Sequence, residues 1–313
     1  MRVTHNMLHS RILDDINSNF RNIAKLHMQG SSGKKVIYPS DDAIVATRAS
    51  NIASRIREMD QYQRNANTVE TYLKAYDTVT GEMSSLVYRL RELTVQGANG
   101  TLTEHDRKTI ANEIDSIREH MVQLANTNVS GEYIYGGSQS DVPPVDQNGQ
   151  ILPGLQPGEG SRTVFMFGMA ANADQKISVD LGGYRFEYNT TVYEAFTVDG
   201  NETIFNLVNN ISQNLKADNP DFYLNEQALE KLDRFEYRIQ QLISRNGSSQ
   251  RFLDMATTRF EDFSLFLTEY LSKEQDADMM EVYTSLANQQ SILEAALKTG
   301  SSVMMTSLVD FVK

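Results

Sequence analysis

Apolar residues recur at alternating intervals of three and four positions along most of this sequence. Between residues 73 and 90, for example, the steps are 3, 4, 3, 4 and 3. This spacing places the side chains on one stripe of a helix, and the stripe must pack against another helix to leave water. Long, coiled-coil-like helices are therefore expected. The example series consists of Leu73, Tyr76, Thr80, Met83, Val87 and Leu90.

The first long run covers residues 52–97 and shifts its phase slightly at Val69. It predicts either one helix of about 50 residues or two collinear helices. Asn99-Gly100 suits the left-handed backbone conformations that end a helix and turn the chain. Thr103 then has the side chain of an N-cap, and the apolar spacing of residues 110–124 predicts a second, antiparallel helix.

The same spacing returns in residues 228–242 and again in residues 253–270. Residues 244–250 between these runs are polar but keep the register. The pattern fits a turn at this point and equally a weakly packed part of one continuous helix. Aromatic residues in this region also recur at roughly helical spacing, and packing explains most of them without a ligand. They are Phe252, Phe260, Phe263 and Phe266.

Both chain ends carry an apolar stripe that has no partner nearby in the sequence. A single amphipathic helix cannot bury its own stripe, so the simplest arrangement pairs the first helix with the last. Incompletely buried stripes also suit contact with other copies of the chain. The expected assembly interface therefore includes Ile12, Ile16, Phe20, Ile23, Leu26, Tyr283, Leu286, Leu293 and Leu297.

Residues 141–222 differ from the rest of the chain because they contain five of the six prolines and eight of the eighteen glycines. Two β-rich runs flank Gly182-Gly183 and predict a hairpin, since adjacent glycines tolerate the positive φ angles of a tight turn. Residues 162–168 are expected to form another strand. The spacing of residues 204–215 predicts one short amphipathic helix.

These elements predict a mainly α-helical fold. It is expected to be an elongated rod of long coiled-coil-like helices, with the N- and C-terminal helices paired and a β-containing inserted domain. The inserted segment carries four basic and eleven acidic side chains, a net charge of −7, which suits exposure to solvent. The expected regions are a terminal coiled-coil region of residues 1–40 and 279–313, a helical bundle domain of residues 41–140 and 222–278, and an outer domain of residues 141–221.

The composition argues against several classes of function. The 41 acidic residues outnumber the 29 Lys and Arg residues, and the net charge of −12 does not suit nucleic-acid binding, which needs clustered cations. The absence of cysteine excludes disulfides, thiolate nucleophiles and cysteine-ligated metals. No stretch has the apolar length of a membrane span, and residues 1–20 offer no hydrophobic run for a cleaved signal peptide.

Candidate catalytic and metal-binding groups are few. His5 and His9 are spaced to lie on one face of a helix, but no acidic residue in that first turn completes a metal site. The acidic pair at 41–42 is better explained as the first turn of a helix capped by Ser40, and the pair at 276 and 278 as solvated carboxylates. Because no nucleophile, base and oxyanion donor come together, we expect no enzyme, cofactor or metal.

Several motifs resemble the bacterial flagellins and flagellar hook-associated proteins. Ser-Ser-Gly at 31–33, followed by Asp-Asp-Ala at 41–43, is similar to an N-terminal segment of this family, and Arg-Glu-Leu-Thr-Val-Gln at 91–96 is similar to a later one. Residues 287–296 and 307–311 resemble the C-terminal helix of the same group. The resemblance covers the helical two-thirds of the chain well and the inserted segment only loosely.

Within this family the sequence is most similar to the hook-filament junction branch. Residues 131–138 read Gly-Glu-Tyr-Ile-Tyr-Gly-Gly-Ser and are followed by Pro143-Pro144, which resembles the passage typical of that branch. Tyr135 stands where Phe is usual, a mild change that keeps the ring.

The resemblance implies a structural subunit of the flagellum that forms the junction layer between a hook-associated protein and the flagellin filament; a flagellin filament subunit is the alternative. It implies contacts with other copies of the chain, the first hook-associated protein, flagellin and an export chaperone at the C-terminal helix, with no nucleic-acid or membrane partner. It also implies an extracellular location, reached through the flagellar type III export channel without a cleaved signal peptide. It adds Leu308 to the expected assembly interface.

The alternatives to this resemblance are two other classes of protein: a coiled-coil binding module and an enzyme. A coiled-coil binding module would explain the spacing and the acidity, but not the motifs at 31–43 and 91–96. An enzyme site in the inserted segment would have to work without histidine or cysteine.

Since the terminal stripes would be poorly buried in a single subunit, both chain ends are expected to be largely disordered until neighbouring molecules supply partners.

Overall fold

The computed structural model describes residues 2–99, 101–137, 139–151, 176–199, 202–217 and 222–311. The chain divides into two compact units, named unit 1 (Met1–Asp60 and Asp262–Lys313) and unit 2 (Gln61–Glu261). Helices dominate, accompanied by a small strand-containing region, which confirms the predicted fold class. Within the described ranges, no helix combines the length and apolar character needed to cross a membrane. The strand expected at 162–168 lies outside the described residues.

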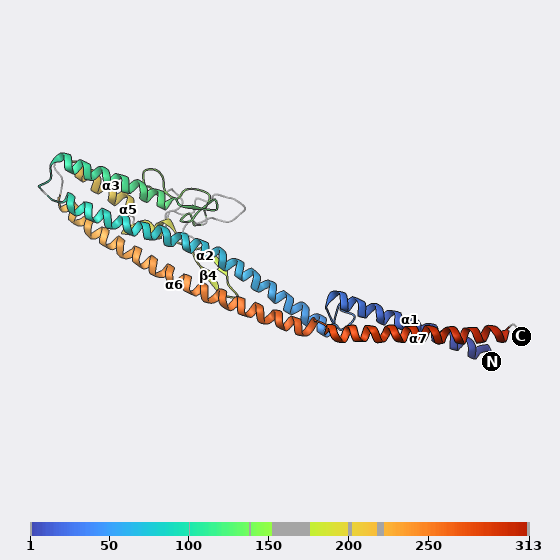
Figure 1. Cartoon of the computed structure of the whole chain (residues 1–313). Coiled ribbons are helices and arrows are strands. Elements are labelled where there is room, and N and C mark those ends of the chain that lie inside the picture. The colour runs from blue at the N-terminus through green and yellow to red at the C-terminus, as the bar shows by residue number, and fades with distance from the viewer. Residues whose placement is uncertain are drawn as a thin grey trace. The chain divides into compact units, whose positions relative to one another are not determined.

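Unit 1 is built on the first and the last helix of the chain. Helix α1 spans Arg2–Ser32 and helix α7 spans Met279–Phe311. They lie side by side with both chain termini at the same end of the pair (Figure 1). The predicted pairing of the terminal helices is therefore confirmed. Unit 1 also includes the beginning of α2 (Ala43–Gly97) and the end of α6 (Phe222–Gln275).

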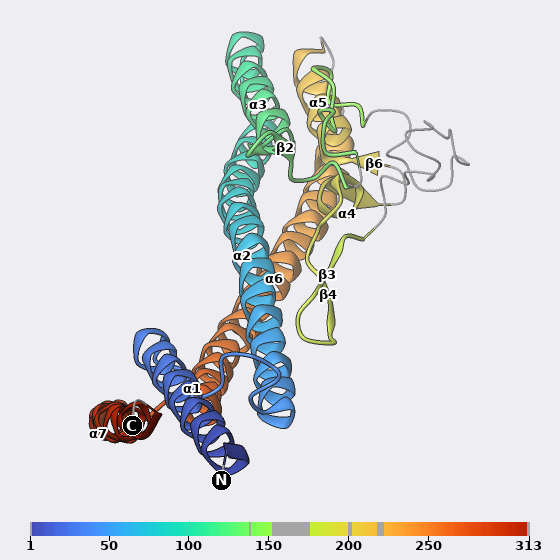
Figure 2. The same cartoon turned by 90° about the vertical axis from the view of Figure 1, so that its right-hand side faces the viewer.

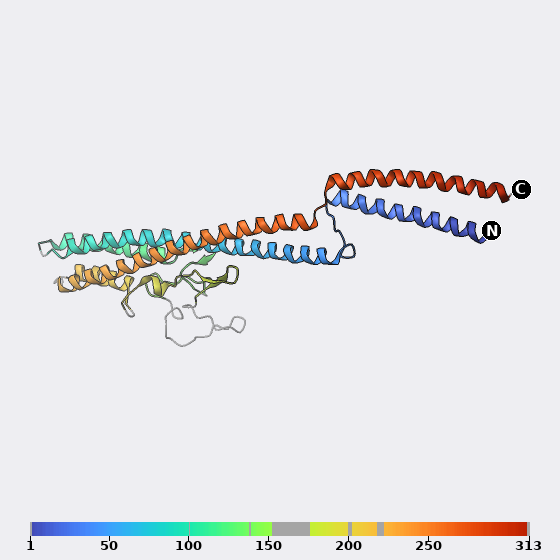
Figure 3. The same cartoon turned by 90° about the horizontal axis from the view of Figure 1, so that it is seen from below.

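Within unit 2, α2 and α6 run side by side in opposite directions (Figure 3). The Asn246 side-chain amide donates a 2.9 Å hydrogen bond to the Leu73 carbonyl, and Arg91 Nε lies 2.8 Å from a carboxylate oxygen of Asp233. Each of the two helices is continuous. The polar residues 244–250 are thus part of one helix, which decides between the two structures that the sequence left open.

Helices α3 (Glu104–Ala125) and α5 (Ile204–Lys216) also belong to unit 2 (Figure 2). Thr103 caps α3 as predicted, because its hydroxyl accepts from the Asp106 N–H while the Asp106 carboxylate accepts from the Thr103 N–H. Lys216 on α5 forms an ion pair with Asp115 on α3. The predicted apolar stripes form the core, which includes Leu73, Tyr76, Met83, Val87, Leu90, Ile110, Ile114, Met121, Val208, Ile211, Leu215, Leu232, Phe235 and Ile239.

The strands in the described part of unit 2 form two-stranded antiparallel pairs. With the short helix α4 (Val192–Phe196), most of them lie together on one side of α2 and α6 (Figures 2 and 3). Gly182 and Gly183 have φ angles of 72° and 87° between β3 and β4, which confirms the predicted hairpin. The pairs are β1 (Asn128–Val129) with β2 (Glu132–Tyr133), β3 (Ser178–Asp180) with β4 (Arg185–Glu187), and β5 (Thr197–Asp199) with β6 (Glu202–Thr203).

The start of α2 differs from the prediction. The Asp42 carboxylate accepts hydrogen bonds of 3.0 Å from the N–H groups of Ile44 and Val45, so Asp42 caps the helix. Ser40 lies in the preceding turn and is not the cap. Several consecutive polar residues can occupy a capping position, and the helix uses the one whose carboxylate reaches the free N–H groups.

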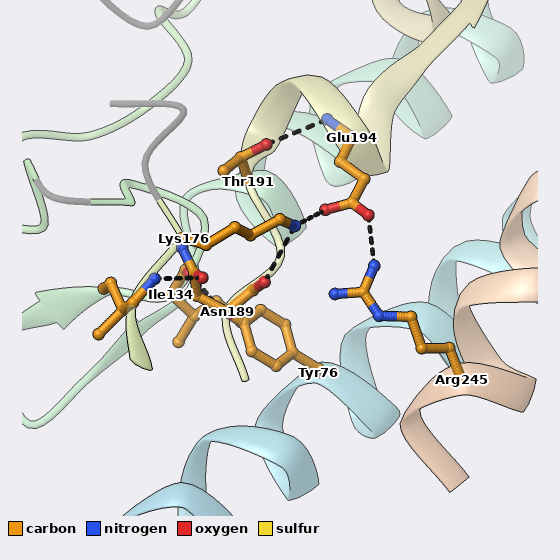
Figure 4. A network of polar contacts seen from close by, with 8 residues as sticks. Tyr76, Ile134, Lys176, Asn189, Thr191, Glu194 and Arg245 are labelled. Atoms are coloured by element: carbon orange, nitrogen blue, oxygen red, sulfur yellow. Dashed lines mark hydrogen bonds and ion pairs between the residues drawn. The ribbon is translucent and has the colours of Figure 1, made fainter. Parts of the chain in front are cut away.

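A polar cluster connects the strand region to α6 (Figure 4). The Glu194 carboxylate on α4 accepts hydrogen bonds from the Lys176 ammonium and from the Arg245 guanidinium on α6. The Asn189 side-chain oxygen accepts a 2.7 Å bond from the Ile177 N–H. Burial acts to raise the pKa of Glu194, but the Lys176 hydrogen bond and the two cationic charges outweigh it and hold that pKa below its ordinary value.

Candidate assembly interface

Helices α1 and α7 meet along a narrow seam. In its middle, Gln289 Nε2 donates a 2.8 Å hydrogen bond to Asn19 Oδ1. Further along, Gly300 faces α1 so closely that a Cβ atom built on it would lie 3.2 Å from Cγ2 of Ile12 and 3.8 Å from Cδ1 of Ile16. The missing side chain therefore permits the close approach of the two helices at this point.

The predicted interface residues fall into two sets. Phe20, Tyr283 and Leu297 are exposed, with residue accessibilities of 52%, 57% and 45%. Leu308 lies in α7, but its side chain is outside the described residues. Exposure therefore divides the predicted residues, and among the half-buried ones Ile12 and Ile16 lie next to Gly300 of α7. The half-buried set consists of Ile12, Ile16, Ile23, Leu26, Leu286 and Leu293.

Unit 1 exposes further large apolar side chains that the sequence prediction did not include. Leu13 on α1, Ile44 on α2, and Met280 and Ile292 on α7 all have about half or more of their surface exposed. The alternating spacing does not pass through these four positions. The separation of seven residues between Leu13 and Phe20 is the available sequence signal, since that spacing returns to nearly the same face of a helix.

Three exposed aromatic rings form a row along the last turns of α6 in unit 1. The ring centroids of Phe263 and Phe266 are 6.0 Å apart, and those of Phe266 and Tyr270 are 6.4 Å apart. All three side chains are exposed. The prediction that packing accounts for the aromatic residues is right for Phe252, which stacks on Phe186, and for buried Phe260. It is wrong for Phe263 and Phe266, whose face of α6 is not covered within the described part of unit 1.

The connection between α1 and α2 is held against the junction of α6 and α7. The Lys35 N–H donates to the Gln275 carbonyl over 2.7 Å, and the Ala277 N–H donates to the Gly33 carbonyl over 2.9 Å. Gly33 makes this turn possible with a φ of 69°. These backbone bonds place the ends of α1 and α6 next to one another, independently of the apolar seam.

Charged groups near this connection have structural roles. Lys25 lies 3.0 Å from Asp41, and its hydrogen bond lowers the pKa of that carboxyl group. Asp278, expected to be only solvated, accepts hydrogen bonds from the Met280 and Glu281 N–H groups and so caps α7. Among the described residues, no three His, Asp or Glu side chains gather as a metal site would require. What unit 1 presents chemically is apolar surface for helix packing.

The comparisons with known sequences lead to flagellar proteins. Residues 3–140 match the family model described as the bacterial flagellin N-terminal helical region. The flagellar hook-associated protein 3 of Salmonella typhimurium is 29% identical over 164 residues, which cover 52% of this chain and 51% of that protein. The protein of the same name from Escherichia coli K12 is 22% identical over 100% of both chains. A flagellin of Clostridium tyrobutyricum is 24% identical over 225 residues, covering 70% of this chain and 60% of its own.

Solved structures share the fold. A putative flagellar hook-associated protein from Vibrio parahaemolyticus aligns with a TM-score of 0.64 and 19% identity, over 75% of this chain and 100% of its own. The flagellar junction protein FlgL from Legionella pneumophila aligns with a TM-score of 0.56 and 15% identity, over 73% of this chain and 99% of its own. These alignments extend the likeness beyond the N-terminal region that the family model matches.

Proposed function

Because this chain is a relative of the bacterial flagellins and flagellar hook-associated proteins, we propose that it is a structural subunit of the flagellum that forms the junction layer between a hook-associated protein and the flagellin filament. The observation that carries the proposal is the alignment with hook-associated protein 3 of Escherichia coli over the full length of both chains. The shared fold with a solved junction protein supports it.

Unit 1 supplies the proposed contact surface. Six of the expected interface residues are half-buried, while Phe20, Tyr283 and Leu297 remain exposed. Covering these side chains with helices of neighbouring subunits removes apolar surface from water and so favours assembly. The proposed partners are other copies of this chain, the first hook-associated protein on one side of the layer and flagellin on the other.

The proposal includes a route to the outside of the cell and a way to prevent early assembly. The chain would pass through the flagellar type III export channel without a cleaved signal peptide and take its place in the external flagellum. An export chaperone would cover α7 before export, since exposed Met280, Tyr283 and Leu297 would otherwise attract other apolar surfaces. This role uses packing surfaces and requires no catalytic group or cofactor.

A flagellin filament subunit is the second candidate function. The flagellin family model over residues 3–140 and the similarity to the Clostridium tyrobutyricum flagellin favour it. The two functions differ in what their loss does to the flagellum. A junction layer is needed for any filament to attach to the hook, whereas one of several flagellins contributes only part of the filament.

Deletion of the gene in its host tests both candidates. Cells are imaged by electron microscopy, and flagellin is measured in the medium, with the wild-type gene on a plasmid as the control. Bare hooks with flagellin shed as monomer are expected for a junction protein. Attached filaments that are shortened or altered would instead identify one flagellin among several and contradict the proposal.

A further inference from the structure

Tyr135 brings a polar group into the interior of unit 2. Its ring lies 5.3 Å from that of Tyr76 and 5.0 Å from that of Phe196, both in edge-to-face arrangements, and the residue is 1% exposed. Its hydroxyl has no hydrogen-bond partner among the described residues. Burial raises the pKa of Tyr135, so the phenol keeps its proton and the hydroxyl is a donor in need of an acceptor.

Asn246 brings a second polar group to the same place. It lies in the polar part of α6 and is 7% exposed. Its Nδ2 atom donates a 2.9 Å hydrogen bond to the Leu73 carbonyl on α2. Because a carbonyl accepts but cannot donate, this bond fixes which end of the amide faces α2. The other end, Oδ1, has no partner among the described residues and is an acceptor in need of a donor.

Both residues line one small cavity in unit 2. Its volume is about 20 Å³, and its walls include Tyr76, Thr80 and Ser249 in addition to Tyr135 and Asn246. A site of this size holds a single water molecule, and a buried water is stable when it finds two or more polar partners. Two residues that each carry a buried polar atom without a partner among the described residues thus line a space large enough for one water.

We propose that this cavity binds one ordered water molecule, which accepts a hydrogen bond from Tyr135 Oη and donates one to Asn246 Oδ1. The bridge joins the loop that carries Tyr135 to α6, and the Asn246 amide continues the link to Leu73 on α2. A water bound to both atoms satisfies each of the two buried groups. A single buried Asn between long helices also fixes their register, because sliding one helix would leave its amide unpaired.

Removing the Tyr135 hydroxyl changes the stability of the protein in opposite directions, depending on whether a water bridges that hydroxyl or the hydroxyl is unpaired. Tyr135→Phe in the full chain removes only the hydroxyl, and unfolding in urea is followed by circular dichroism. With the water bridge, the ratio of folded to unfolded protein at a fixed urea concentration falls about two- to tenfold. Without it, the substitution removes an unpaired buried polar group, so an unchanged or increased ratio would overturn the proposal.

Tyr76→Phe is the matched control. Tyr76 is also a buried tyrosine, but its hydroxyl donates directly to the Ile134 carbonyl at 2.5 Å. Its removal takes away one direct hydrogen bond, and the fall in the ratio calibrates the loss expected for one such bond. A crystal structure of the full chain at about 1.8 Å resolution gives the direct test: a density peak about 2.6–3.2 Å from both oxygen atoms supports the site, and a cavity without one overturns it.

Discussion

At the residue scale, both the backbone conformation and the close packing at Gly149 require a glycine. Its φ is 80°, and a Cβ atom built on it would lie 2.6 Å from Cβ of buried Phe205. Both atoms are held by their backbones, so neither moves aside easily. Gly149→Ala is expected to lower the free energy of unfolding by about 2–4 kcal/mol, through left-handed strain and overpacking. Urea unfolding of the variant and the wild type measures the change.

Gly183→Ala provides the matched control for this prediction. Gly183 also has a positive φ, of 87°, but its added Cβ would meet no heavy atom within 4 Å. Strain alone is expected to cost about 1 kcal/mol there. Equal losses in the two variants would show that the approach of Gly149 to Phe205 contributes nothing.

Glu194 makes the stability of unit 2 depend on pH. Despite burial, the pKa of Glu194 in the folded protein lies below its ordinary value because of the ion pairs with Lys176 and Arg245. These ion pairs contribute fully to the free energy of unfolding above the unfolded pKa of about 4.3. Their contribution is lost as the pH falls through the folded pKa. Glu194→Gln is expected to lower stability by about 1 kcal/mol at pH 7 and to reduce the loss between pH 5 and about pH 3. Urea midpoints across this range measure both effects.

Glu119→Gln tests whether that pH dependence belongs to Glu194. Glu119 is an exposed residue of α3 with no ion pair among the described residues. The same curve as the wild type is expected for this variant. A Glu194→Gln curve that runs parallel to the wild type through the acid range would mean that the cluster in Figure 4 does not titrate as argued.

At the scale of the element, local signals in the sequence are sufficient for some features. Thr103 with Asp106 forms a capping box, and Gly182-Gly183 forms a hairpin, because both depend on neighbouring residues alone. Spacing also identifies the core of unit 2. These features require no knowledge of which helix packs against which.

Features that depend on packing against another element of the chain could not be predicted from local sequence. Phe260 and Phe263 both fit the helical spacing of α6, but only Phe260 is buried, because the position of the neighbouring elements decides which face is covered. The polar residues 244–250 resemble a turn until Asn246 is seen to bond Leu73 on α2. Likewise, the spacing of the terminal stripes does not separate half-buried Ile16 from exposed Phe20.

The α1–α7 pair is expected to be essential for assembly and dispensable for unit 2. Ile16→Asp places a carboxylate in the half-buried seam near Gly300, where it loses hydration without gaining a cation. Incorporation into flagella is expected to be abolished while residues 44–270 stay folded. Immunoblots of purified flagella and the urea unfolding transition of the soluble chain measure the two properties. Normal incorporation would contradict the role of the seam.

Phe20→Ser tests the exposed face of the same helix. Phe20 is 52% exposed, so its loss is expected to leave the monomer as stable as the wild type and to reduce incorporation severalfold. The control is Asn17→Ser, a change at an exposed polar position of α1 that is expected to affect neither property. If Phe20→Ser incorporates as well as this control, the exposed apolar residues of α1 do not form the proposed contact.

At the scale of the whole molecule, the two units differ in how much of their helical structure rests on buried side chains. Helix α3 in unit 2 has eight buried residues along its 22 positions. None of the described residues of α1 is buried, and the buried described residues of α7 are Val282 and Gly300. Helices gain most of their stability from packing, so α1 in a single subunit opens far more readily than α3.

Amide hydrogen exchange is expected to show this difference directly. In the unassembled chain, residues 8–28 should exchange rapidly while residues 110–124 of α3 stay protected, because exchange follows the free energy of local opening. In assembled flagella, neighbouring helices are expected to cover the apolar faces of α1, and residues 8–28 should become protected. The chain would then acquire its terminal structure only where its neighbours are present, which keeps monomers from polymerising before export. Strong protection of residues 8–28 in the unassembled chain would contradict this coupling of folding to assembly.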